Sequence, residues 1–322
     1  MNNRIFSIDL VKGMLIILVI VGHVLPGSIS ENPLRAFIYS FHMPVFIAVS
    51  GYMLNYRWLL DVGFFEIFKK YKNRIIIPWL IAFLVYFLFH EVQRAEMQML
   101  DNIGMELLFP FYHLWFIPAF FSWLIMARFI GRSRFISGKI LLISLIISIV
   151  TYGLSKNIFS LDFIHHKSII MRFIHDTIRP YYFVFFVFGI KLKEIISRFP
   201  NINWEITFFS ILIFCCAYLS MKDEPISFVL YYFFNVILIV WILKTIAENN
   251  FPSVRWMEWL GVNSMGIYLW HVFPIIIVKY FLSTENIVYY YALMVMSIFI
   301  FFIVYYFLNQ IKLFRRVLFG LS

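Results

Sequence analysis

The sequence predicts an all-α polytopic membrane protein of about ten transmembrane helices with both termini cytoplasmic. Of its 322 residues, 62% are hydrophobic and 21% are aromatic. Only 14% are charged, whereas soluble domains carry about a quarter. The apolar residues are gathered into segments separated by charged and turn residues, and a helical span needs about 20 residues. This composition excludes the soluble, disordered and disulfide-scaffold classes of protein.

Ten apolar segments follow one another along the chain, and we expect each to form a membrane helix. No internal repeat, low-complexity tract or linker separates them, so we expect residues 1–322 to form one integral-membrane domain with no appended soluble domain. The ten segments span residues 8–25, 36–54, 75–90, 113–130, 140–153, 178–190, 204–220, 226–243, 264–282 and 288–308.

The distribution of basic residues sets the predicted orientation. With the N-terminus inside, 19 of the 27 Lys and Arg residues fall in inner connections, as is typical of cytoplasmic loops. This bias explains the net charge of +10 through membrane topology and contact with membrane lipids, so no nucleic-acid partner is expected. The eight residues on the outer side are Arg35, Arg94, Lys156, Lys167, Arg172, Arg179, Lys222 and Lys279.

The first segment carries two ionisable residues on one helix face. Lys12 and His23 are eleven residues apart, which is close to three helical turns and a rise of about 16 Å. Ionisable groups at membrane depth are costly, so this stripe indicates a functional site. The alternative is an interfacial pair of Asp9 with Lys12 and a histidine satisfied by a carbonyl. The segment could also imitate a signal peptide, but its polar residues argue that it is retained.

The second and fourth segments add further polar candidates. His42 lies two residues before Pro44, and we expect the proline to interrupt the helix, as is typical beside a cavity. His113 and Trp115 open the fourth segment from the outer side. Taken singly, each of these residues is more typical of packing or of the membrane interface.

The ninth segment carries Ser264, Tyr268 and His271 at i, i+4 and i+7, which places them on one helix face. This recurrence makes the face a stronger candidate than any isolated polar residue. No metal site is expected. Five outer-loop residues could be imagined as a metal cluster, but their spacing fits no zinc pattern and a solvated loop is favoured: Asp162, His165, His166, His175 and Asp176.

A basic run at 69–74 lies at the predicted inner surface and contains Lys70, Lys72 and Arg74. Such runs commonly serve topology and attraction to anionic lipids. Lys and Arg also provide the charge and the directed donors that bind phosphate groups. The run is therefore also a candidate clamp for a cytoplasmic phosphorylated ligand.

Taken together and in this order, the motifs resemble the membrane acyltransferase-3 family, the bacterial integral-membrane O-acyltransferases of surface polysaccharides. The first-span cation is Lys12, where the family also uses Arg, and the inner basic motif keeps only Arg74 of an Arg-x-x-Arg pattern. The resemblance spans residues 6–271 and rests on Asp9-x-x-Lys12-Gly13, Lys12-x10-His23, Phe41-His42-Met43-Pro44-x-Phe46, Ser50-Gly51-Tyr52, Arg74 with Pro78, His113-Leu114-Trp115-Phe116 and Ser264-x3-Tyr268-x2-His271.

The resemblance implies an enzyme of the bacterial plasma membrane that moves an acyl group, usually acetyl from acetyl-CoA, to a hydroxyl of a saccharide. It implies that His23 is the general base, while Tyr268 or His271 stabilises the oxyanion or orients His23. The implied residues that bind the donor phosphates are Lys12, Lys70, Lys72 and Arg74, and those on the acceptor side are His42, His113 and Trp115.

Two alternatives stay open at this point. A transporter or exporter of a glycan or lipid-linked sugar would also use broken helices and polar groups at the membrane midplane. The lack of an internal repeat and the stripe from Lys12 to His23 favour the enzyme. A succinyl group could also replace acetyl within the same fold, because the volume around the thioester sets that choice.

Overall fold

The computed structural model describes residues 6–94, 99–133, 139–155, 169–196, 204–221, 226–248, 252–281 and 287–321, and every regular element in these ranges is helical. The order is α1 (Phe6–Val24), α2 (Pro33–Met53), α3 (Tyr56–Asp61), α4 (Phe64–Tyr71), η1 (Lys72–Ile76), α5 (Ile77–Arg94), α6 (Met99–Leu108), α7 (Phe116–Arg132), α8 (Ile140–Ser155), α10 (Ile169–Phe173), η3 (Ile174–Ile178), η4 (Pro180–Tyr182), α11 (Phe183–Ile195), α12 (Trp204–Ser220), α13 (Ser227–Ala247), α14 (Arg255–Val262), α15 (Ser264–Trp270), α16 (Val272–Phe281), α17 (Ile287–Gln310) and α18 (Lys312–Val317).

The all-α prediction is confirmed, and each of the ten predicted apolar segments contains a helix. Five described helices are long and apolar enough to cross a membrane, or six when α14 is joined to the helix that follows it across a 67° bend. The segments at α8 and α12 are apolar but shorter. The number of ten spans and the side on which the termini lie therefore stay predictions.

Local sequence signals explain where helices begin. Asn32 caps α2 because its side chain accepts a hydrogen bond from the Arg35 amide, and Pro33 occupies the first turn, where a missing N–H costs nothing. Asn55 caps α3 in the same way. The fourth segment begins later than expected: α7 starts at Phe116, because residues 111–115 form a turn that brings His113 inward before the helix.

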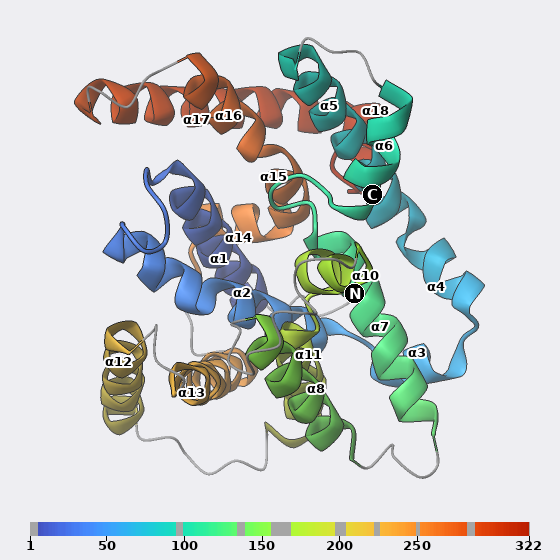
Figure 1. Cartoon of the computed structure of the whole chain (residues 1–322), viewed down its shortest axis with the longest axis vertical. Coiled ribbons are helices and arrows are strands. Elements are labelled where there is room, and N and C mark those ends of the chain that lie inside the picture. Colours follow the sequence, from blue (N-terminus) through green and yellow to red (C-terminus); the bar gives the residue numbers. More distant parts are fainter. Residues whose placement is uncertain are drawn as a thin grey trace.

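Close helix packing depends on glycine. A side chain at Gly13 of α1 would meet the main chain of Met257, and one at Gly261 of α14 would meet the main chain of Asp9. Small residues of this kind let helix backbones approach within membranes. The α1–α14 contact therefore fixes the start of α1, where Lys12 lies. Figure 1 shows α1 and α14 side by side, with α16 and α17 running together along one edge of the molecule.

Pro44 does not interrupt α2, so the expected break is wrong. The helix continues from Pro33 to Met53 with the proline inside it. Pro44 lacks the N–H that would donate to the Ser40 carbonyl. The buried side chain of Asn235 on α13 supplies the missing donor, with its Nδ2 at 3.0 Å from the Ser40 oxygen. A partner helix thus satisfies the backbone group that the proline leaves free.

Candidate active site

Three histidines from distant parts of the chain meet in the interior. His23 lies at the end of α1, His113 in the turn before α7, and His271 at the junction of α15 and α16. The His23 ring centroid is 5.3 Å from that of His271 and 6.1 Å from that of His113. The rings of His113 and His271 are 4.9 Å apart. The structure therefore brings together three of the predicted site residues, which we call the histidine cluster.

Main-chain carbonyls orient two rings of the histidine cluster. His271 Nδ1 lies 3.1 Å from the Ile267 oxygen and 2.9 Å from the Tyr268 oxygen, so this nitrogen carries the proton. His113 Nε2 lies 3.2 Å from the Leu269 oxygen and is likewise the donor. The other nitrogens, His271 Nε2 and His113 Nδ1, are buried and accept no hydrogen bond from the described residues. Each presents a lone pair suited to a hydroxyl or N–H donor.

Two tyrosine hydroxyls, and a residue with left-handed backbone conformation, position the histidine cluster. The Tyr268 hydroxyl donates to the main-chain carbonyl of His113, and the Tyr86 hydroxyl donates to the Leu269 carbonyl at 3.1 Å. Tyr112, directly before His113, has a φ of 46°, a conformation that non-glycine residues adopt at a cost. Tyr268 is therefore committed to positioning His113, and a role as oxyanion donor would require it to exchange this partner.

His42 is connected to the histidine cluster through a tyrosine. Its Nδ1 lies 2.7 Å from the Ile38 carbonyl on the same helix, and its side chain is buried. The Tyr39 ring lies 4.9 Å from the His42 ring and 6.4 Å from the His23 ring. His42 therefore lies beside the cluster, in contact with the aromatic side chain that borders it.

Trp115 is packed among protein groups. Its ring is buried, with the Arg179 guanidinium 3.8 Å from the ring centroid and the Tyr182 ring stacked at 6.0 Å. Arg179 was not among the predicted site residues, although its φ of 49° marks a strained position. A second cation that the sequence did not single out is Lys279, whose Nζ donates to the His23 carbonyl at 2.9 Å.

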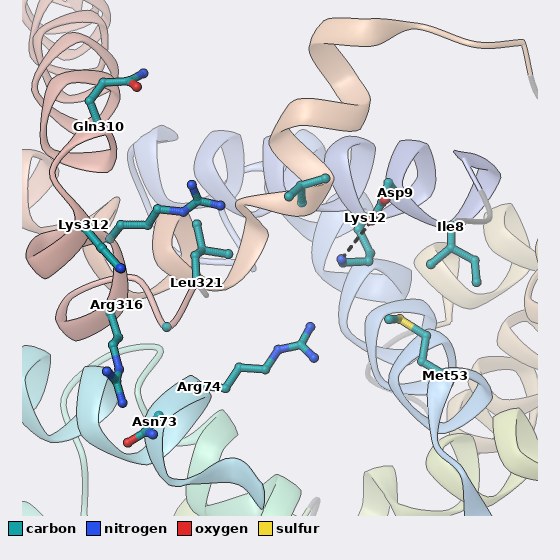
Figure 2. A pocket seen from close by; sticks show the side chains of 13 residues that line it. Ile8, Asp9, Lys12, Met53, Asn73, Arg74, Gln310, Lys312, Arg316 and Leu321 are labelled. Carbon is teal, nitrogen blue, oxygen red and sulfur yellow. Dashed lines mark hydrogen bonds and ion pairs between the residues drawn. The ribbon is translucent and has the colours of Figure 1, made fainter. Parts of the chain in front are cut away.

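A large cavity lies at the other end of α1. Its volume is about 1120 Å³, slightly above the usual range of about 300–1,000 Å³ for ligand sites. Lys12 and Arg74, two of the predicted phosphate-binding residues, line it, and Lys12 pairs with Asp9 at 3.2 Å. Figure 2 shows Arg74 projecting into the space between Lys12 and the side chains of α18. We call this space the basic cavity.

The other two predicted phosphate-binding residues lie outside the lining of the basic cavity. Lys70 Nζ lies 3.5 Å from the centroid of the Trp58 ring, which is a cation–π contact. Lys72 begins the π-helical turn η1 and is exposed. Its neighbours Asn73 and Arg74, in the same turn, reach the cavity. π-helical turns inside helices are frequent at functional sites, and no sequence pattern predicted this one.

Three further cations line the basic cavity that, from the sequence alone, are distinguished only as basic residues of the predicted inner side. Lys312, Arg315 and Arg316 of α18 line the cavity opposite Lys12. Among the described residues that line the cavity, they make five cations with Lys12 and Arg74, against one carboxylate, that of Asp9. The composition of the lining thus favours a multiply charged anion.

The outer-loop residues considered as a metal cluster lie partly outside the described residues, namely Asp162, His165 and His166. Of the remaining pair, His175 Nδ1 lies 2.6 Å from a carboxylate oxygen of Asp176, which also contacts Arg172. Across the described ranges no group of three or more His, Cys, Asp or Glu side chains is arranged to hold a metal ion.

Comparison with known proteins identifies the family. The chain is 33% identical over 135 residues to nodulation protein NolL of Sinorhizobium fredii, which covers 37% of this chain and 36% of that protein. It is 31% identical over 136 residues to nodulation protein NolL of Mesorhizobium japonicum, covering 39% and 36%. The chain thus matches about a third of each relative's length. No solved structure matches it. A family model described as acyltransferase domain matches residues 5–306, and the chain therefore belongs to the acyltransferase-3 family.

Proposed function

We propose that this protein is an O-acyltransferase that moves an acetyl group from cytoplasmic acetyl-CoA to a hydroxyl of a cell-surface saccharide in the bacterial plasma membrane. The observation that carries the proposal is the convergence of three histidines at one end of α1, while the basic cavity lies at its other end. An anionic donor with a reactive group at its far end needs both features.

The two sites are spaced for an extended donor. Lys12 and His23 lie eleven residues apart on the unbroken helix α1, a rise of about 16 Å. In coenzyme A, a pantetheine arm separates the phosphates from the thioester. With the phosphates in the basic cavity, the arm would run beside α1 and bring the thioester to the histidine cluster.

The chemistry requires one base and a positioned acceptor. The lone pair of His23 takes the proton of the acceptor hydroxyl as that oxygen attacks the thioester carbonyl carbon. The tetrahedral intermediate then collapses, the carbon–sulfur bond breaks, and the proton on His23 passes to the departing thiolate. The products are an O-acetyl ester and free coenzyme A.

The acceptor side of the histidine cluster suits a hydroxyl-rich molecule. His113 Nδ1 and His271 Nε2 each present a buried lone pair that can accept a hydrogen bond from a sugar hydroxyl. These contacts would hold the reacting hydroxyl beside His23. His42 lies behind Tyr39, whose ring contacts both His42 and His23.

The test replaces His23→Ala and compares it with His175→Ala, a histidine paired with Asp176 outside the histidine cluster. Binding of labelled acetyl-CoA to the solubilised protein and the O-acetyl content of surface glycans are measured for each. We expect both variants to bind the donor and only His23→Ala to lose acetylation.

Three results would contradict the proposal. Full acetylation by His23→Ala would refute the role of this histidine. Two negative results together would favour the transporter: the wild-type protein binds no acetyl-CoA, and surface glycans carry the same O-acyl groups in cells with and without the protein. Mass spectrometry showing succinyl esters would replace acetyl by succinyl.

A further inference from the structure

We propose that the three cations of α18 bind the phosphate groups of the donor's nucleotide end, so that the C-terminal segment forms one wall of the donor site. This inference rests on the proposed function, because it assigns residues to the donor named there. The cations lie beyond residue 306, where the family match ends, and nothing in that match assigns them a role.

The charge of the lining supports a ligand with several phosphates. Lys12 has a carboxylate partner in Asp9, whereas Arg74, Lys312, Arg315 and Arg316 form no ion pair with the part of the chain described. Like charges at one cavity repel one another unless an anion lies between them. A phosphomonoester and a diphosphate together bring about four negative charges, which matches this excess.

The C-terminal segment packs against the rest of the protein, which holds the main chain that carries its cations beside the cavity. The Trp270 indole N–H donates to the Leu318 carbonyl at 3.1 Å, which ties the segment to the end of α15. The Phe319 ring is buried and lies 4.2 Å from the Tyr305 ring of α17. The Leu321 amide donates to the Arg315 carbonyl at 3.1 Å and closes the turn after α18.

A glycine brings this segment against Arg74. Gly320 has a φ of 66°, and a side chain there would meet the main chain of Arg74. Positive φ and close approach are both conditions that glycine meets without strain. The backbone contact therefore sets the distance between η1 and α18, and with it the separation of the two groups of cations that would grip a phosphate between them.

Phosphate groups at this face could come from the donor or from anionic lipids. Leu313 of α18 is exposed, as in helices that lie along a membrane surface. The three cations are exposed, but they line the same open cavity as Lys12 and Arg74, and Figure 2 shows Arg316 and Lys312 on the side of that cavity opposite Lys12. This arrangement favours a ligand held inside the cavity over a headgroup on its rim.

The test measures the Kd of coenzyme A for the full chain in nanodiscs, by calorimetry. The double variant Arg315→Ala/Arg316→Ala is compared with Arg315→Lys/Arg316→Lys, which keeps the charge, and with Arg57→Ala/Arg132→Ala, an equal loss of charge outside the cavity lining. We expect the first variant to raise the Kd about tenfold or more, and the two controls to change it by less than about threefold.

Each other outcome has a distinct meaning. If wild-type protein binds no coenzyme A, the proposed function fails and takes this inference with it. If wild-type protein binds and Arg315→Ala/Arg316→Ala binds equally well, only this inference is overturned. Discs of phosphatidylcholine alone and discs that also contain phosphatidylglycerol separate the two phosphate sources: an effect of the variant that occurs only with the anionic lipid would overturn the assignment to the donor. Circular dichroism and gel filtration of each variant exclude misfolding as the cause of a loss.

Discussion

Removing the hydrogen bond from Asn235 to the Ser40 carbonyl tests whether this bond lets α2 continue past Pro44. Replacing Asn235→Leu keeps a side chain of similar size and removes the donor. Asn235 is fully buried and its Nδ2 lies 3.0 Å from the Ser40 oxygen. A buried carbonyl that loses its donor costs about 1–3 kcal/mol, and interhelical hydrogen bonds in membranes fall toward the lower end. We expect the free energy of unfolding to fall by about 1–2 kcal/mol.

The assay is unfolding by sodium dodecyl sulfate in mixed micelles, followed by circular dichroism. The same replacement is made in a Pro44→Ala background, where residue 44 regains an N–H that can donate to the Ser40 carbonyl within the helix. There we expect the cost of Asn235→Leu to shrink by about 1 kcal/mol. Asn235 Nδ2 also donates to the Tyr231 carbonyl at 2.9 Å, a contact that is lost equally in both backgrounds. Equal losses in the two backgrounds would refute the reasoning.

Two further replacements test the site and its support. Tyr268→Phe removes the hydroxyl that donates to the His113 carbonyl. In steady-state kinetics we expect kcat to fall about tenfold while the KM for the donor stays unchanged. An unchanged kcat would contradict a positioning role for Tyr268. Gly261→Ala places a methyl group against the main chain of Asp9, and we expect it to lower the free energy of unfolding by about 1–3 kcal/mol and to weaken coenzyme A binding. Gly104→Ala, with no neighbour within 4 Å, is the control, and equal stability of the two alanine variants would argue against a tight α1–α14 contact.

The sequence was informative wherever a polar residue interrupted an apolar run. His23 and His271 stood out on that ground, and the structure brings them within 5.3 Å of each other. The helices followed from the same contrast, because lipid permits few polar groups and forces the backbone to satisfy its own hydrogen bonds. Lys12 and Arg74 were recognisable because they also belong to ordered motifs.

Features that depend on contacts between residues far apart in the sequence could not be predicted from it. The donor that rescues the Ser40 carbonyl lies 195 residues away, so the sequence around Pro44 predicted a break that does not occur. Arg315 and Arg316 were indistinguishable from the basic residues that orient any membrane protein, and only their position opposite Lys12 sets them apart. Lys70 shows the converse: the basic run suggested a phosphate ligand, but the nearby Trp58 ring takes up its ammonium group.

The unbroken helix α1 separates the two ends of the proposed donor site by a set distance. Its rise fixes the interval from Lys12 to His23, and the main-chain contact at Gly13 leaves α1 no room to slide along α14. Donors that differ only in their acyl group would then bind in one register, with the carbonyl carbon at the same height and any extra carbons projecting beyond it. The affinity for the donor and the selectivity for its acyl group would therefore be separable properties. Substitutions in the basic cavity would change the affinities for all acyl-CoA donors by the same factor, and only substitutions beyond His23 would change the order of preference among acyl groups.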